Sequence, residues 1–413
     1  MNHFKKQQIQ NIADFNPREQ LAKGALAKSV PMAMLKEFQR QITGYEIKAF
    51  NGGAKFRNGD TLLAKITPCL ENGKTAFVDI LDDGEVAFGS TEFIVLRAKN
   101  ETNPEFLYYF AISPDFRKRA IECMEGTSGR QRVNENALKT LELPIPEPQI
   151  QQSIAAVLSA LDKKIALNKQ INARLEEMAK TLYDYWFVQF DFPDANGKPY
   201  KSSGGDMVFD ETLKREIPKG WGSIELQSCL AKIPNTTKIL NKDIKDFGKY
   251  PVVDQSQDFF GKYPVVDQSQ DFICGFTNDE KSILNPQDAH IIFGDHTRIV
   301  KLVNFQYARG ADGTQVILSN NERMPNYLFY QIINQIDLSS YGYARHFKFL
   351  KEFKIILPSK DISQKYNEIA NTFFVKVRNN LKQNHHLTQL RDFLLPMLMN
   401  GQVSVRCSGA RDG

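Results

Sequence analysis

The chain has 413 residues, of which 42% are hydrophobic and 24% are charged, and its formal net charge is +5 at pH 7. This length allows two or three domains, each large enough to bury its own core, and the mildly basic charge permits a polyanionic partner. No apolar run is long enough to cross a membrane, and residues 1–10 lack the apolar region of a signal peptide, so we predict a cytoplasmic protein. The five cysteines are widely scattered, which excludes a paired-cysteine metal or redox motif.

Residues 1–146 predict a first domain of mixed α/β structure. Three short β-rich runs, at 61–66, 76–80 and 93–97, are separated by Gly and Asn turns. A helix is predicted from Pro104 to about Glu122, because proline is well tolerated at the first helical position. The polar loop 126–134 follows, and loops of that composition often contact a ligand.

Residues 147–190 predict a long helix with a coiled-coil seam. Positions spaced alternately by four and three residues are mostly apolar from Ile154 to Trp186, and they include Asn168 and Asn172 midway. The alternative is an ordinary amphipathic helix packed on its own domain. Sustained 4-3 spacing favours the coiled coil, and asparagine in a seam usually fixes the register at a cost in stability.

Residues 191–358 predict a polar linker followed by a second domain, whose later part repeats the order of the first. The segment 247–259 reads FGKYPVVDQSQDF, and 260–272 repeats it letter for letter. Two identical copies indicate a recent duplication in the coding DNA. We expect the extra copy to bulge at the surface or to extend a hairpin, because loop-closure entropy grows only slowly with length.

Residues 359–402 repeat the long helix. Asn380 and Asn384 lie 212 residues after Asn168 and Asn172, since 380 − 168 = 212 and 384 − 172 = 212. In an antiparallel pair Asn172 meets Asn380 and Asn168 meets Asn384. We therefore predict an α+β fold with two similar globular domains, separated by two helices packed as an antiparallel coiled-coil spacer with pseudo-twofold symmetry.

Two further features of the C-terminal region follow from this alignment. The same register places Leu161 opposite Arg391, which is the one poor layer of the predicted seam. Residues 403–413 are polar and glycine-bearing, and we predict that they form a disordered tail.

The sequence contains no recognisable catalytic motif. Asn16-Pro17-Arg18 is too short to serve as the Asn-Pro-Pro-aromatic motif with which amino-methyltransferases grip a flipped base. His296 beside Asp295 suits a general base or a metal ligand, but no second ligand stands at the required spacing. We favour a turn in which Asp295 caps backbone N–H groups while 296–298 point outward, where such donors suit phosphates and guanine edges.

Five segments together resemble the DNA-specificity subunit of type I restriction-modification systems: 143–187, the linker through 217–221, 263–269, 293–298 and 394–396. The resemblance implies two target-recognition domains that each read half of a bipartite DNA site, and helices that set the separation of the halves. It also implies two methyltransferase subunits docked on the spacer helices, and restriction and translocase subunits in the full complex. The chain itself would have no active site and bind no cofactor, whereas its partners would use S-adenosylmethionine, ATP and Mg.

The DNA contacts that we predict are basic, amide or hydroxyl side chains: Arg57, Lys65, Lys74, Arg130, Gln131 and Arg132 in the first domain, and Gln268, His296, Thr297, Arg298, Arg309, Arg345 and His346 in the second. Because the two domains differ in sequence, we expect an asymmetric target. Two alternatives stay open: a helical scaffold that binds only proteins, and an enzyme with an unrecognised site around His296.

Overall fold

The structure is a computed structural model that describes residues 4–99, 101–127, 129–233, 238, 240–243, 250–253, 275–310, 313–342 and 344–404. Of the tandem repeat only 250–253 is described, as a strand, so the expected bulge or hairpin lies outside the described residues, as do Gln268 and the tail 405–413. The chain divides into two compact units, residues 1–167 with 383–413 and residues 168–382. Each long helix therefore contributes to both units.

The first unit contains two four-stranded sheets. The antiparallel sheet β2-β9-β6-β7 consists of β2 (Ala13–Phe15), β9 (Phe93–Ala98), β6 (Thr61–Ala64) and β7 (Thr75–Phe77). The sheet β4-β3-β8-β5 consists of β4 (Glu46–Ala49), β3 (Leu26–Val30), β8 (Ala87–Gly89) and β5 (Ala54–Phe56). The three predicted β-rich runs correspond to β6, β7 and β9, which confirms them.

Shorter elements complete this unit. Two antiparallel pairs join β1 (Phe4–Gln8) to β12 (Glu142–Pro146) and β10 (Met124–Glu125) to β11 (Arg132–Val133). The helices are α1 (Ile9–Ile12), α2 (Pro104–Ile112), α3 (Pro114–Glu122), α4 (Glu135–Thr140) and a 3-10 turn at Met32–Met34. Strand β12 leads directly into the long helix α5 (Pro148–Tyr183).

The single helix predicted from Pro104 to Glu122 is wrong, because the chain breaks at Ser113. The Ser113 hydroxyl donates to the Phe110 carbonyl at 2.7 Å and accepts from the Phe116 amide at 3.4 Å. A residue that precedes proline disfavours the helical conformation, and serine is a good N-cap. Ser113 therefore ends α2 and caps α3, with Pro114 as the first residue of α3.

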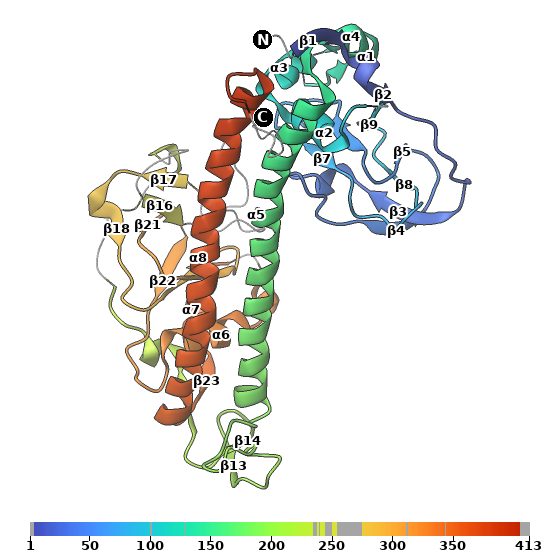
Figure 1. Cartoon of the computed structure of the whole chain (residues 1–413). Coiled ribbons are helices and arrows are strands. Elements are labelled where there is room, and N and C mark those ends of the chain that lie inside the picture. The colour runs from blue at the N-terminus through green and yellow to red at the C-terminus, as the bar shows by residue number, and fades with distance from the viewer. Residues whose placement is uncertain are drawn as a thin grey trace, which may run out of the picture. The chain divides into compact units, whose positions relative to one another are not determined.

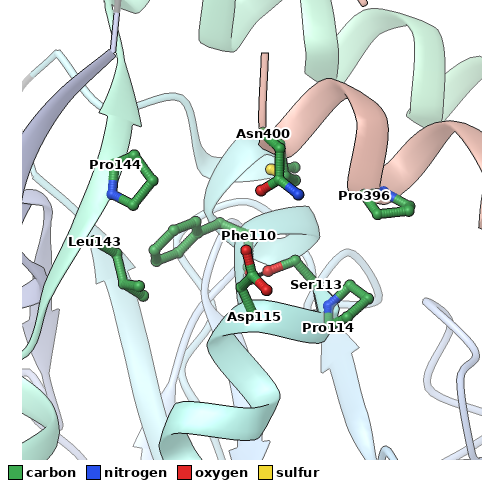
Figure 2. A pocket seen from close by; sticks show the side chains of 9 residues that line it. Phe110, Ser113, Pro114, Asp115, Leu143, Pro144, Pro396 and Asn400 are labelled. Atoms are coloured by element: carbon green, nitrogen blue, oxygen red, sulfur yellow. Dashed lines mark hydrogen bonds between the residues drawn. The ribbon is translucent and has the colours of Figure 1, made fainter. Parts of the chain in front are cut away.

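The core of the first unit is completed by the end of α8 (Lys360–Met399). Leu395, Leu398 and Met399 are buried in the same apolar cluster as Phe106 of α2 and Ile9 of α1. Figure 2 shows the small notch at this junction, where Pro396 and Asn400 lie around the same space as Phe110 and Ser113. The two ends of the chain thus meet in one core.

The second unit repeats the strand order of the first. Its sheets are β20-β19-β22, β17-β16-β21-β18 and the pairs β13-β14 and β15-β23. The strands are β13 (Met207–Asp210), β14 (Arg215–Pro218), β15 (Gly222–Glu225), β16 (Tyr250–Val253), β17 (Gly275–Thr277), β18 (Ile283–Leu284), β19 (His290–Gly294), β20 (Val300–Val303), β21 (Tyr307–Arg309), β22 (Thr314–Ile317) and β23 (Lys354–Leu357). The helices are α6 (Asn326–Asn334), α7 (His346–Glu352), a π-helical turn at Asp184–Val188 and 3-10 turns at Leu226–Cys229, Asn241–Asp243, Glu280–Ser282 and Ser339–Tyr341.

Three correspondences support the predicted duplication. β6 lies between β7 and β9, as β19 lies between β20 and β22, and all four pairings are antiparallel. An early strand of each domain pairs with the last: β1 pairs with β12, and β15, which follows the β13-β14 hairpin, pairs with β23. A short helix, α4 or α7, precedes that last strand, and a long helix follows it.

Within each unit the two long helices run antiparallel (Figure 1), and every predicted seam residue is buried or half-buried. In the second unit the Tyr366 hydroxyl donates to the Ala179 carbonyl at 3.0 Å. The predicted pair is present there: Asn380 Nδ2 donates to Asn172 Oδ1 at 2.8 Å. In the first unit Asn384 Nδ2 lies 3.4 Å from the carbonyl of Ile165.

The Asn172–Asn380 contact predicts energetic coupling. We expect Asn172→Ala and Asn380→Ala each to destabilise the second unit, and the double variant to lose about 0.5–1.5 kcal/mol less than their sum, the usual net contribution of one hydrogen bond. Denaturant unfolding of the four proteins measures this coupling free energy. Strictly additive losses would show that the two asparagines do not interact.

The layer of Leu161 and Arg391, which was predicted to pack poorly, is instead a buried polar network. Arg391 Nη1 binds Asp162 Oδ1 at 2.8 Å, one position along from the expected neighbour, and both side chains are less than 10% exposed. The Tyr109 hydroxyl of α2 donates to the other Asp162 oxygen at 2.7 Å. Burial and the charge of Asp162 raise the pKa of Tyr109, which keeps it a donor. The ion pair with Asp162 therefore accommodates Arg391 in an otherwise apolar seam.

A buried histidine makes the second unit sensitive to acid. His290 is 7% exposed on β19, its Nδ1 lies 3.1 Å from the Tyr307 hydroxyl, and burial lowers its pKa from 6.5 to about 4. Between those values the unfolded chain binds a proton that the folded chain does not, so stability falls as pH drops through this window, by roughly 3 kcal/mol. We expect His290→Gln to remove this contribution. Hydrogen exchange of β19 and β20 at pH 4 to 7 tests it, and equal pH dependence in both proteins would contradict it.

Candidate nucleic-acid interface

In the first domain, the predicted contacts gather where β6 ends. Lys65 follows β6 directly, and its carbonyl accepts from the Val133 amide at 2.9 Å. Two residues later the Thr67 amide donates to the Gln131 carbonyl at 3.1 Å. These backbone bonds bring Gln131 and Arg132, which are distant in sequence, beside Lys65.

Carboxylates hold several of these cations in place. Arg132 donates to both oxygens of Glu92, at 2.7 and 2.9 Å, and this bond lowers the pKa of the Glu92 carboxyl. Lys65 lies 3.8 Å from Glu135, and Arg57 lies 3.7 Å from Glu19. Because Arg57 and Arg132 keep more than half of their side-chain surface exposed, they remain accessible to a phosphate or a base edge.

The remaining candidates of this domain differ in exposure. Lys74 is half-buried just before β7, where its carbonyl accepts from the Ala64 amide at 3.1 Å. Arg130 is exposed in the loop between β10 and β11. Within the described part of the chain its side chain has no ion pair, so it is free to reach a ligand.

A hollow of about 770 Å³ opens beside Lys65. It is lined by residues 16–20, 53–55, 65, 91, 93 and 95. Sequence reasoning placed Lys65 among the contacts, but it missed Arg18 and Gln20. The available signal was the short polar stretch of residues 16–20, which is too brief to identify a site.

In the second domain, the turn after β19 has the predicted Asp295 cap, but of residues 296–298, which were predicted to point outward, only Arg298 is exposed. Asp295 Oδ1 accepts from the Phe347 amide at 2.8 Å, and the Asp295 carbonyl accepts from the His346 amide at 2.8 Å. Asp295 thereby holds the start of α7 against the turn. His296 and Thr297 are half-buried, whereas Arg298 is exposed, with φ at 65° and its Nη1 3.3 Å from the Leu338 carbonyl.

His346 was predicted to contact DNA, but the structure buries its side chain. Its side chain is 2% exposed, and its ring nitrogens lie 3.0 Å from the carbonyls of Asp295 and Gly342. It supports the turn from inside, because the N-terminus of α7 is buried against β19. Its neighbour Arg345 is exposed, and Arg309 is half-buried at the end of β21.

The two domains therefore present candidates at equivalent places, the end of the central strand and the start of the short helix. Among the described residues no group of three or more His, Cys, Asp or Glu side chains could hold a metal ion, and no described helix is long and apolar enough to cross a membrane. Basic and amide side chains at equivalent places of one repeated topology suit the recognition of DNA.

The chain is similar in sequence to known proteins over most of its length. The family model described as "Type I restriction modification DNA specificity domain" matches residues 8–177. The chain is 28% identical over 319 residues to the MjaIX specificity subunit of Methanocaldococcus jannaschii, covering 73% of this chain and 69% of that one. It is 26% identical over 418 residues to the HindI specificity subunit of Haemophilus influenzae, covering 86% and 90%.

A solved structure supports the fold. The S subunit of a type I system from M. genitalium aligns with a TM-score of 0.51 and 17% identity, over 96% of each chain. The sequence matches support a specificity subunit of a type I restriction-modification system, and recognition of a DNA sequence fits that assignment.

Proposed function

We propose that this chain binds a bipartite, asymmetric site in double-stranded DNA, one half per domain, and directs methylation and restriction by partner subunits. The observation that carries this proposal is the repeated topology with different side chains at equivalent places. Lys65 and Arg132 stand at the end of the central strand in the first domain, and Arg298 and Arg345 in the second. One scaffold with two sets of donors suits two different half-sites.

The long helices suit the role of spacer. Helix α5 has 36 residues and α8 has 40, which at 1.5 Å per residue correspond to about 54 and 60 Å. Half-sites one DNA turn apart are separated by about 34–36 Å. Helices of this length are therefore long enough for the separation between two half-sites.

The same helices offer surface to methyltransferase subunits, two of which we propose dock there. Met178 and Tyr185 are 52% and 38% exposed, and Leu390 and Phe393 are 45% and 62% exposed. Contiguous apolar patches mark interaction surfaces, and on each helix the two exposed side chains are seven or three residues apart, a spacing that places them on one face. The restriction and translocase subunits would join the full cytoplasmic complex, and the partners would supply the active sites and use S-adenosylmethionine, ATP and Mg.

Co-purification with the cognate methyltransferase subunit, followed by sequencing of methylated positions in genomic DNA, tests the proposal. We expect a stable complex and one motif with two unlike halves separated by unspecified bases. A complex that methylates a single uninterrupted motif would contradict the bipartite assignment. Failure to form a complex would favour a scaffold for other proteins.

A further inference from the structure

The hollow beside Lys65 carries an inference that the family does not supply. We propose that it is the base-reading surface of the first domain, and that Arg18 and Gln20 are its specificity-determining residues. The inference rests on the proposed function, because it names the residues that read one of the two half-sites.

The backbone of the segment is fixed at its start. Asn16 adopts a left-handed conformation, with φ at 49°, which asparagine tolerates better than most residues. Its amide donates to the Val95 carbonyl at 2.8 Å, and its Oδ1 accepts from the Val95 amide at 2.9 Å. Its Nδ2 donates to Glu135 at 2.9 Å. These bonds of Asn16 therefore attach the segment to β9 and α4.

The middle of the segment is fixed through Glu19. Arg97 donates to Glu19 Oε1 at 2.5 Å, and Lys55 Nζ donates to the Glu19 carbonyl at 2.9 Å. Arg97 also binds Asp60, whose side chain is 1% exposed, through two bonds of 2.7 Å. Glu19 is thus drawn toward a buried ion-pair network, and its charge is offset there.

Arg18 and Gln20 flank Glu19 and are both exposed. Neither side chain has a hydrogen bond or an ion pair in the described part of the chain. Glu19 is half-buried and held by Arg97, whereas its two neighbours are exposed, so Arg18 and Gln20 lie on the solvent side of the segment. Both residues line the hollow, so they present free donors on a rigid backbone.

The charge of the hollow fits DNA. Three cations, Arg18, Lys55 and Lys65, line it with the single carboxylate of Glu19, which is already paired. Lysines are suited to phosphates as point charges, whereas the arginine fork matches O6 and N7 of guanine and the glutamine amide matches N6 and N7 of adenine. We therefore assign guanine to Arg18 and adenine to Gln20.

The test compares methylated motifs made by the complex of the full chain with its methyltransferase subunit. Arg18→Ala and Arg18→Lys are both expected to relax one position of one half-site, lowering discrimination against the wrong base about 10- to 100-fold. Gln20→Ala is expected to relax another position of the same half-site. The other half-site stays unchanged in all three variants. The lysine variant retains the charge and loses the fork, so it separates base reading from general attraction to DNA.

Arg119→Ala is the matched control, because Arg119 is an exposed arginine of the same domain that lies outside the hollow. It should leave the motif unchanged. Wild-type motifs in both Arg18 variants and in Gln20→Ala would overturn the inference while leaving the proposed function standing. A wild-type complex that methylates no bipartite motif would overturn the proposed function, and this inference with it.

Discussion

Removal of residues 395–413 is expected to unfold most of the first unit, although these residues lie more than 230 positions from its other buried core residues. Leu395, Leu398 and Met399 are 6%, 2% and 6% exposed and pack in its core. Deleting one buried side chain of this size typically costs about 2–5 kcal/mol, and a whole domain is stable by only about 5–15 kcal/mol. Hydrogen exchange should therefore show loss of protection in α2 and β9.

A chain that ends at Ser404 is the matched control, because it keeps α8 whole. The point variant Leu398→Ala gives the same test without truncation, and we expect it to lower the stability of the first unit by about 2–5 kcal/mol. Unchanged protection of α2 in the 395–413 deletion would show that the N-terminal domain holds its core without the C-terminal helix.

The second large effect concerns the Asp162–Arg391 pair. Arg391→Met leaves the buried Asp162 carboxylate with the Tyr109 hydroxyl as its remaining partner within the described part of the chain, and we expect a loss of about 3–5 kcal/mol. Asp162→Leu should also destabilise, although Arg391 keeps a contact to Asp392 at 2.8 Å. Replacing both removes the two buried charges together, so the double variant should be more stable than Arg391→Met alone.

Urea unfolding, with hydrogen exchange in α2 as the local probe, measures these differences. In the double variant the Tyr109 hydroxyl has lost its acceptor, Asp162. Adding Tyr109→Phe removes this unpaired hydroxyl and should raise the stability further. If the double variant lost the sum of the two single losses, the ion pair would not be the interaction that holds this layer together.

Repetition within the chain made much of the fold predictable. The seam asparagines fixed an antiparallel register in advance, and the Asn172–Asn380 bond has that register. The three β-rich runs of the first domain also had clear boundaries, because glycine and asparagine turns separate them. Regular spacing and turn chemistry are local properties, so one sequence is enough to read them.

Features that depend on side-chain partners were not predictable. Arg391 looked misplaced because its partner, Asp162, lies one residue outside the seam. His346 looked like a surface contact because nothing local shows that the end of β19 covers it. The domain limits predicted at 146 and 358 follow the helix starts, whereas the compact units divide inside the helices, at 167/168 and 382/383.

The candidate site was predictable only in part, for the same reason. Lys65, Gln131 and Arg132 were proposed from composition, and the structure brings them together. The hollow combines four separate stretches of chain, and the directions of Arg18 and Gln20 depend on the anchoring of Glu19 by Arg97. A long-range ion pair of this kind leaves no local pattern in the sequence.

The most direct test of the central claim is binding of the purified complex to duplexes that carry the methylated motif, one half of it, or both halves with one base pair added between them. A bipartite reader on a spacer of fixed length should lose affinity when either half is scrambled, and again when the spacing changes with both halves intact. Equal affinity for a duplex with only one half would contradict recognition by two domains.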